Sequence, residues 1–241
     1  MCGVPFHSAE GYITRLVSKG YKVAICEQVE DPKLAKGLVK REVVRIVTPG
    51  TNCNLEALDE SKNNYLMGVV AMDDLFGISV VDVTTGEYRL TEVDGLGKLL
   101  DEINKFMPSE LICNESFYIS GVDVEDLKER LGISISSLAP HYFDQECCKK
   151  SLCRHFSVQT LDGLGLADYS VGITAAGAVM EYLEETQKTS LAHILELIPY
   201  KVGKYMLLDR NTRRNLELVE TLREKKKRGS LLWVLDRTRT A

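Results

Sequence analysis

Residues 66–91 read L-M-G-V-V-A-M-D-D-L-F-G-I-S-V-V-D-V-T-T-G-E-Y-R-L-T and carry the strongest structural signal in the chain. The apolar runs in this stretch are short and rich in β-branched residues, which is typical of buried strands. Turn sequences separate the runs, Asp73-Asp74 after the first and Thr84-Thr85-Gly86 after the second. We therefore predict three consecutive antiparallel strands, at 66–72, 77–83 and 87–91.

Beyond this meander the pattern changes to helices that alternate with a strand. Leucine and isoleucine at helical spacing predict a helix over 96–103, and Asp123 is placed to cap a second helix that Gly132 ends. A short apolar strand, 111–113, lies between them. Three antiparallel strands followed by helix, strand and helix are typical of a ribonuclease H-like α/β sheet. We assign residues 52–200 to this domain.

Two more helices are predicted inside the same domain. Residues 143–156 carry apolar side chains on one helical face, and residues 170–187 are apolar nearly all round. The second segment contains Ala-Ala-Gly-Ala at 175–178, and such small residues allow neighbouring elements to approach closely. We therefore expect the 170–187 helix to be buried on several sides.

The first 51 residues predict an incomplete α/β unit. Ser8 can cap a helix that Gly20 ends, and short apolar strands are expected at 23–26 and 42–47. A helix and two strands are too few to form a self-sufficient sheet domain. We therefore expect this unit to contain only part of a mixed sheet.

Residues 201–241 are expected to begin an all-α domain. After a short apolar strand and an aspartate turn, helices are predicted over 212–227 and 231–235. The basic run 225–228 would complement the dipole at the C-terminal end of the longer helix. Few residues follow that could cover the apolar stripe of this helix, so we expect the stripe to be exposed and the chain to be an interior part of a larger protein. The stripe consists of Leu216, Val219 and Leu222.

The composition is that of an ordinary soluble globular chain. Of 241 residues, 44% are hydrophobic and 27% are charged, and the net charge of −5 excludes a generally basic nucleic-acid coat protein but not a local basic patch. Seven scattered cysteines favour reduced thiols over a disulfide framework. The opening M-C-G-V-P-F-H has neither the basic nor the apolar region of a signal peptide, and no apolar run is long enough to span a bilayer. We therefore predict a soluble, cytoplasmic protein without a membrane partner.

Asp73, Asp74 and Asp82 raise an alternative function. They lie on or between the first strands, where nucleases of this architecture hold two Mg²⁺ ions with clustered carboxylates. A stand-alone ribonuclease H-like nuclease is therefore one alternative, and Mg²⁺-dependent cleavage that is lost in Asp73→Asn would support it. We favour a structural turn, because no further acidic residue completes the site and a fold does not carry its function with it.

Cys147, Cys148, Cys153 and His155 invite a zinc interpretation. The spacing C-C-x₄-C-x-H lacks the C-x₂₋₄-C knuckle that wraps a tetrahedral ion, so we favour buried or unreactive thiols on a helix. We predict no catalytic, cofactor-binding or metal-binding residue in this chain.

Seven motifs, in order along the chain, resemble the family of bacterial mismatch-recognition ATPases called MutS. The first three resemble the second half of the mismatch-binding domain, the next three the connector domain, and the last the start of the core (lever) domain. This implies domains at 1–51, 52–200 and 201–241. The motifs are M-C-G-V-P-F-H-S-A-E-G-Y, V-A-I-C-E-Q-V-E-D-P, V-V-R-I-V-T-P-G-T, G-L-G-L, A-A-G-A-V-M-E-Y, T-Q-K-T-S-L-A-H-I and L-D-R-N-T-R-R-N-L-E-L.

The resemblance implies a function in DNA mismatch repair. Full-length members bind mispaired duplex DNA, hydrolyse ATP with Mg²⁺ and act as homodimers. The resemblance places Arg41, with Lys40 and Lys36, near the duplex, where each phosphate contact would add salt-sensitive affinity without base specificity. The plainer interpretation of this basic segment is a solvated loop.

The resemblance also implies a protein partner. In the family the connector offers a docking face to the downstream protein MutL, and Lys149, Lys150 and Ser151 lie in the corresponding stretch. A second alternative is therefore a pure protein-interaction module. Capture of a MutL homologue by residues 52–200 without DNA would support that role.

Two hallmarks of the family are absent from the sequence. It contains no Phe-x-Glu, the motif whose phenylalanine wedges beside the mispaired base, and no G-x-x-x-x-G-K-[ST] phosphate loop for ATP. We therefore expect this chain by itself neither to recognise a mismatch nor to hydrolyse ATP. Its expected role is that of a connector between the DNA-binding and ATPase regions.

Overall fold

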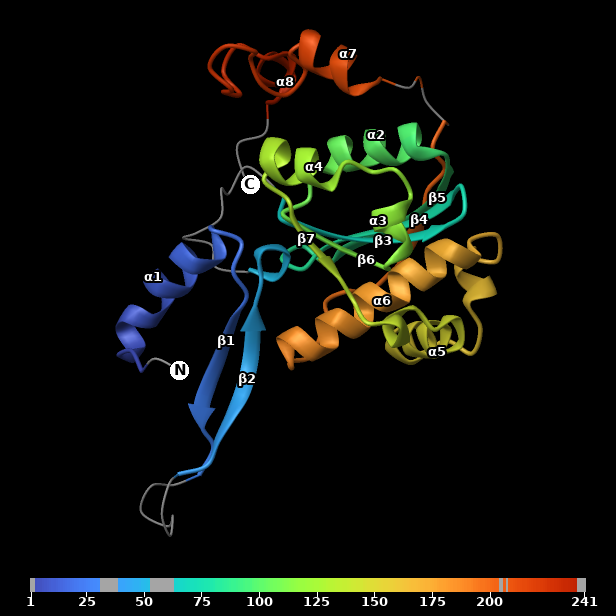
Figure 1. Ribbon diagram of the computed structural model, residues 1–241. Helices are drawn as coiled ribbons and strands as arrows, with labels where there is room; N and C mark the ends of the chain where they lie inside the picture. Colours follow the sequence, from blue (N-terminus) through green and yellow to red (C-terminus); the bar gives the residue numbers. More distant parts are fainter. Residues whose placement is uncertain (1–2, 31–38, 53–62, 204–205, 207, 238–241) are drawn as a thin grey trace.

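The computed structural model describes residues 3–30, 39–52, 63–203, 206 and 208–237. A six-stranded sheet with helices on both faces lies at its centre, and a smaller unit projects from one end (Figure 1). The strands stand in the order β7-β6-β3-β4-β5-β8. Their bounds are β3 Tyr65–Met72, β4 Leu75–Asp82, β5 Glu87–Asp94, β6 Glu110–Cys113, β7 Ser134–Ser137 and β8 Ile198–Pro199.

The first three strands of this sheet form the predicted meander. β3 pairs with β4, and β4 with β5, antiparallel along their whole lengths. β6 runs parallel to β3 on its other side, and β7 runs parallel to β6. An antiparallel meander extended by two parallel crossover strands is the ribonuclease H-like arrangement, so the predicted fold class is confirmed.

Both edge strands are absent from the sequence-based prediction. β7 reads Ser-Ile-Ser-Ser, and Ile135 is its single β-branched residue, which is too little to mark a strand. β8 is a two-residue bridge that runs parallel to β5. Because an edge strand forms on a neighbour that already exists, its position depends on the sheet more than on its own residues.

Helices cover both faces of the sheet. α2 (Leu96–Phe106), α3 (Ser116–Ile119) and α4 (Val124–Leu131) lie over one face, and α5 (Gln145–His155) and α6 (Ser170–Gln187) over the other (Figure 1). The predicted caps of α4 are confirmed, since the Asp123 side chain accepts from the Asp126 N–H and Gly132 has φ +69°. β3 is buried from both sides, which explains its continuous apolar run.

α6 lies close to the sheet and to α5. A Cβ atom at Gly77 on β4 would lie 2.3 Å from the backbone oxygen of Val171 on α6. A Cβ atom at Gly177 on α6 would lie 2.2 Å from the Cβ of Cys148 on α5. No side chain larger than hydrogen fits at these distances, so the expected close packing of the 170–187 helix is confirmed.

The N-terminus of α6 is capped by the sheet. Tyr169, which precedes the helix, makes no side-chain cap. Glu92 on β5 instead accepts the backbone N–H groups of Val171 and Gly172 at 2.6 and 2.9 Å. A carboxylate here satisfies two otherwise unpaired donors and complements the helix dipole, so it fixes one end of α6 to β5.

The N-terminal unit consists of α1 (Phe6–Val17), β1 (Val23–Gln28), β2 (Arg41–Val47) and the 3-10 turn η1 (Pro49–Thr51). In the described part of this unit β1 and β2 pair only with each other and antiparallel, so the partial sheet expected there consists of two antiparallel strands. The two strands form a hairpin that stands away from the central sheet (Figure 1).

The predicted cap of α1 is also wrong. The helix begins at Phe6, before Ser8, and no side-chain hydrogen bond caps it. Pro5 precedes the helix with φ −60°, a value that suits a helix start, and its carbonyl accepts the Ser8 N–H at 3.0 Å. Ser8 therefore lies inside the first turn.

The predicted long helix at 212–227 does not form. α7 spans Arg210–Asn215 and α8 spans Leu231–Leu235, with turns between them, so the run 225–228 does not end a helix. Helices gain most of their stability from packing an apolar face, and here Leu216, Val219 and Leu222 remain 55, 51 and 49% exposed. The expected exposure of this stripe is confirmed. No helix in the described residues is both long and apolar enough to cross a bilayer.

Candidate functional site

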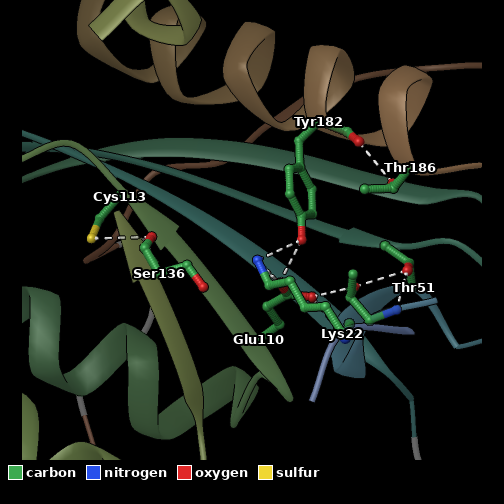
Figure 2. A network of polar contacts seen from close by, with 9 residues as sticks. Lys22, Thr51, Glu110, Cys113, Ser136, Tyr182 and Thr186 are labelled. Atoms are coloured by element: carbon green, nitrogen blue, oxygen red, sulfur yellow. Dashed lines mark hydrogen bonds and ion pairs between the residues drawn. The ribbon is translucent and has the colours of Figure 1, made fainter. Parts of the chain in front are cut away.

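A buried carboxylate joins the N-terminal unit to the central sheet. Glu110 is the first residue of β6, and it is fully buried. One carboxylate oxygen, Oε1, lies 3.2 Å from the Lys22 ammonium and accepts the Tyr182 hydroxyl at 2.7 Å. The other, Oε2, accepts the Thr48 hydroxyl and the Gly50 N–H, the latter at 3.1 Å. We call these five residues the junction network (Figure 2).

The junction network is assembled from three separate parts of the chain. Lys22, Thr48 and Gly50 belong to the N-terminal unit, Glu110 to the sheet, and Tyr182 to α6. Lys22 also donates to the Tyr182 oxygen at 3.0 Å and lies 5.1 Å from the centre of its ring. Burial and the Glu110 carboxylate raise the pKa of Tyr182, so its phenol stays protonated and remains a donor.

Further contacts reinforce this junction. The Lys188 ammonium, at the end of α6, donates to the Val43 carbonyl on β2 at 2.9 Å. The Asn64 side-chain amide donates to the carbonyls of Pro49 and Asn52 at 3.0 and 3.1 Å. The end of the N-terminal unit and the start of β3 are thereby held together.

A pocket lies in the surface next to the same junction. It has a volume of about 280 Å³ and lies between the end of α1 and the loops that follow α2 and α4. Its polar side chains are hydroxyls and amides, without a charged group. They belong to Thr14, Ser18, Asn52, Asn64, Ser109 and Ser134.

A second buried carboxylate lies where the chain leaves the sheet. Glu102 on α2 accepts the Tyr200 hydroxyl at 2.6 Å and the Lys105 ammonium at 2.9 Å. The Thr91 hydroxyl donates to the Tyr200 carbonyl at 2.6 Å. Burial and Glu102 raise the pKa of Tyr200. The sheet therefore uses the same set of groups, a buried Glu with a Tyr and a Lys, at both of its chain junctions.

Two of the three predicted DNA-proximal residues, Lys40 and Arg41, lie at the loop end of the hairpin. Lys40 and Arg41 stand where β2 begins, and both are exposed. Lys40 forms an ion pair with Glu42 at 2.6 Å, which raises the pKa of its ammonium and keeps it charged. Lys36 lies outside the described residues. Both described cations are thus accessible to an anionic ligand.

The predicted docking residues are on α5, but only part of the set is accessible. Lys150 is exposed, and Lys149 is half-buried and lies 3.7 Å from Glu146. Ser151 is buried, with its hydroxyl 3.5 Å from the Glu181 carboxylate on α6. A partner on this surface would therefore meet the two lysines and not the serine.

The acidic residues of the nuclease alternative are separated. Asp73 and Asp74 form the turn before β4, whereas Asp82 is the last residue of β4, at the opposite end of the strand. One Asp82 oxygen accepts the N–H and hydroxyl of Thr84 at 2.9 and 2.6 Å, which closes the next turn. The three carboxylates do not converge, so the geometry gives them structural roles.

The residues of the zinc interpretation are likewise dispersed. Cys148 is buried under α6, Cys147 is exposed, and the His155 imidazole lies 2.9 Å from the Ile194 carbonyl. Among the residues that the structure describes, no three His, Cys, Asp or Glu side chains are grouped to hold a metal ion. Cys148 and His155 instead contribute to the packing of α5.

Thiol reactivity provides a test of this packing. Burial raises the pKa of Cys113 and of Cys148 to about 12, and a hydrogen bond to Asp144 raises the pKa of the exposed Cys147. A raised pKa lowers the fraction of thiolate, which is the nucleophile. In mildly alkaline iodoacetamide we expect the exposed Cys26 to react first, Cys147 more slowly, and the two buried thiols only after denaturation. Peptide mass spectrometry over time measures this order, and rapid labelling of Cys148 in the folded chain would contradict the packing of α5 on α6.

The sequence does not reveal the junction network. Glu110 precedes a short apolar strand, where a charged residue ordinarily belongs to the preceding loop. Its partners lie 62 and 72 residues away in Thr48 and Tyr182. The only local signal is Pro49-Gly50, since the glycine permits the close backbone approach that the structure shows.

Comparison with known proteins identifies the family. Residues 64–195 match the family model described as MutS domain II, and residues 1–56 match MutS domain I. The whole chain aligns with the DNA mismatch repair protein MutS of Lachnoclostridium phytofermentans at 62% identity, and the alignment covers 26% of that protein. The identity is 51% to the MutS protein of Acetivibrio thermocellus and 50% to that of Ruminiclostridium cellulolyticum, and each alignment covers 28% of the relative.

A solved structure shows a weaker likeness. T. thermophilus RuvC in complex with Holliday junction substrate matches 52% of this chain and 97% of its own, with 15% sequence identity and a TM-score of 0.33. That likeness is too weak to support any conclusion, and the fold assignment rests on the sheet topology. The chain spans about a quarter of the length of its curated relatives, 26 to 28%. Because the domain II model alone matches more than half of its residues, the chain belongs to the MutS family.

Proposed function

We propose that this chain is part of a mismatch-recognition protein that binds mispaired duplex DNA and starts its repair. The observation that carries the proposal is 62% identity, over the whole chain, to a protein named DNA mismatch repair protein MutS. Within such a protein, residues 1–51 supply part of the mismatch-binding domain, 52–200 the connector and 201–241 the start of the core. The two buried carboxylates support the connector role, because they tie the sheet to the chain on both sides.

In this proposal the hairpin faces the DNA backbone. Lys40 and Arg41 are exposed at its loop end, and Lys36 lies between them and β1 in sequence. Such contacts add affinity that falls with salt and carry no base information. The chain alone should therefore bind duplex DNA weakly and without preference for a mismatch.

A MutL homologue is the proposed protein partner of the connector. Lys149 and Lys150 present two cations on α5, on the face of the sheet opposite α2. We place ATP hydrolysis, its Mg²⁺ and homodimer formation in parts of the longer protein outside these residues. The compartment that fits DNA repair is the bacterial cytoplasm, in association with the nucleoid. No enzymatic step is assigned to this chain.

A domain exchange tests the proposed function. The 241 residues replace their 62% identical counterpart in the Lachnoclostridium phytofermentans MutS, and the chimera is expressed in a strain that lacks its own MutS. We expect the chimera to lower the spontaneous mutation frequency to that given by the intact relative. A mutation frequency equal to that of the strain without MutS, from a stably expressed chimera, would refute the proposal.

Charge reversal in the same chimera tests the docking face. Lys149→Glu combined with Lys150→Glu should raise the mutation frequency and weaken capture of the MutL homologue. The matched control is Lys98→Glu on α2, an exposed lysine on the other face of the sheet. Equal behaviour of the double variant and the control would remove Lys149 and Lys150 from the docking face.

A further inference from the structure

We infer that Glu110 is a positioning residue. Its carboxylate sets the orientation of the β1–β2 hairpin, and therefore of Lys40 and Arg41 at the loop end of the hairpin, relative to the central sheet. The geometric part of this inference can be measured on the 241-residue chain alone. Its consequence for DNA rests on the proposed function. The two can therefore fail separately.

The carboxylate holds the hairpin at both of its base ends. Lys22 immediately precedes β1, and Thr48 immediately follows β2. The Lys22 ammonium forms an ion pair with one Glu110 oxygen, and the Thr48 hydroxyl and the Gly50 N–H donate to the other. A hairpin gripped at the start of one strand and the end of the other cannot rotate about its base without breaking these contacts.

Close packing also fixes the place where the base of the hairpin contacts the central sheet. A Cβ atom at Gly50 would lie 2.8 Å from the Cβ of Glu110 and 3.0 Å from that of Leu66. Thr48 and Thr51 close η1 through a hydroxyl contact of 2.8 Å and the Thr48 N–H bond of 3.1 Å to the Thr51 hydroxyl. The backbone of η1 therefore rests directly on β6 and β3, with its own conformation locked.

α6 completes this contact from the opposite side. Tyr182 reaches Glu110 through its hydroxyl, as Figure 2 shows, and Lys188 reaches the β2 backbone one turn and a half later. The N-terminus of the same helix is held by Glu92. The position of the hairpin therefore depends on α6, a helix that is held at its N-terminus and contacts the hairpin junction near its C-terminus.

The pocket shows where the hairpin can move when the network is broken. The about 280 Å³ of open space lies between the end of α1 and the loops before β6 and β7. The contacts of Glu110 hold the unit on one side of this space. Without them the N-terminal unit gains room to tilt toward Ser109 and Ser134, whereas the well-packed sheet does not change.

Glu110→Gln is the sharpest variant. A glutamine keeps the size of the side chain, but one of the two acceptor oxygens becomes an amide nitrogen that only donates, so either Thr48 and Gly50 or Tyr182 loses its acceptor. In both orientations the side chain carries no charge for Lys22. The matched control is Glu102→Gln. Glu102 is also buried and also accepts from a tyrosine and a lysine, but at the far junction of the sheet.

The chain offers two native labelling positions for the experiment. Cys26 on β1 and Cys147 on α5 are both exposed, while Cys113 and Cys148 are buried. Cys2, Cys53 and Cys153 are replaced by serine, and spin labels are attached to Cys26 and Cys147. Pulsed electron paramagnetic resonance then measures the distance between the hairpin and the connector. Amide exchange of β1 and β2 gives a second readout, and exchange of β3 to β5 reports whether the sheet remains folded.

The expected result is a single narrow distance distribution for the parent chain and for Glu102→Gln. Glu110→Gln should broaden or shift the distribution and speed amide exchange in β1 and β2 by about tenfold, with β3 to β5 unchanged. Tyr182→Phe should act in the same direction and more weakly, and it keeps the test valid if Glu110→Gln unfolds the sheet. The inference is overturned by a broad parent distribution, by equal broadening in Glu102→Gln, or by a narrow, unshifted one in both Glu110→Gln and Tyr182→Phe.

Discussion

Gly77→Val should remove the cooperative fold of the central sheet. A Cβ atom at this position would lie 2.3 and 2.4 Å from the oxygen and carbon of the Val171 carbonyl and 2.7 Å from the Gly172 nitrogen. These are backbone atoms of the first turn of α6, so no change of rotamer relieves the overlap. α6 must instead move away from the sheet and expose the residues buried between them, such as Val70 on β3 and Ala175 on α6 itself.

The expected size of this effect exceeds that of ordinary overpacking. Extra methyl groups in a core usually cost about 1–3 kcal/mol, because side chains give way. With backbone against backbone we expect a loss above about 4 kcal/mol, a large part of the free energy of unfolding of a single domain. Urea unfolding followed by circular dichroism measures it.

Gly97→Ala is the matched control for Gly77→Val. Gly97 is exposed in the first turn of α2, and a Cβ atom there meets nothing within 4 Å. Alanine in place of glycine in a helix should raise the free energy of unfolding by about 0.5 kcal/mol. A Gly77→Val variant with the unfolding midpoint of the parent would mean that α6 does not lie against β4 as described.

Glu110→Ala is expected to have the second largest effect. It leaves the Tyr182 hydroxyl and the Gly50 N–H without their acceptor inside the junction and leaves the Lys22 ammonium without its counter-charge. Lys22 has 36% of its side chain exposed and can be solvated, so the cost comes mainly from the two buried donors, about 1–3 kcal/mol for each that loses its acceptor, or about 2–6 kcal/mol together. We expect a loss of this size in the free energy of unfolding, measured by urea or thermal denaturation.

Two comparisons make the Glu110→Ala result specific. Glu129→Ala, at an exposed position on α4, should change the free energy of unfolding by less than about 0.5 kcal/mol. Lys22→Ala combined with Glu110→Ala should cost less than the sum of the single variants, because the two groups share one interaction. Additive losses would show that the ammonium and the carboxylate act independently.

Much of the central fold could be predicted from the sequence. The runs at 66–72 and 77–83 lie between turn residues that leave few alternatives to a meander, and they form β3 and β4 within a few residues of the predicted bounds. The burial of α6 follows from its small residues, and both caps of α4 follow from Asp123 and Gly132. In each case the signal and the structure that it predicts lie in the same few residues.

The errors arise where local signals compete with packing. Ser8 has the right side chain for a helix cap, but Pro5 starts the helix earlier. The pattern at 212–227 has helical periodicity, but its apolar stripe stays about half exposed, and within this range only the helical turn of α7 forms. Ser151 reads as a surface residue beside two lysines, and the position of α6 buries it.

Residue patterns along the chain were enough to predict the meander, the buried character of α6, the exposure of the stripe after α7 and membership of the MutS family. The carboxylates that hold the junctions and the strand that caps α6 follow from the packed fold alone. Glu110 meets Thr48 and Tyr182 across 62 and 72 residues, and Lys22 meets Tyr182 across 160. A hydrogen bond depends on positions in space within a few tenths of an ångström, and those positions exist only after the sheet, the helix and the hairpin have packed together.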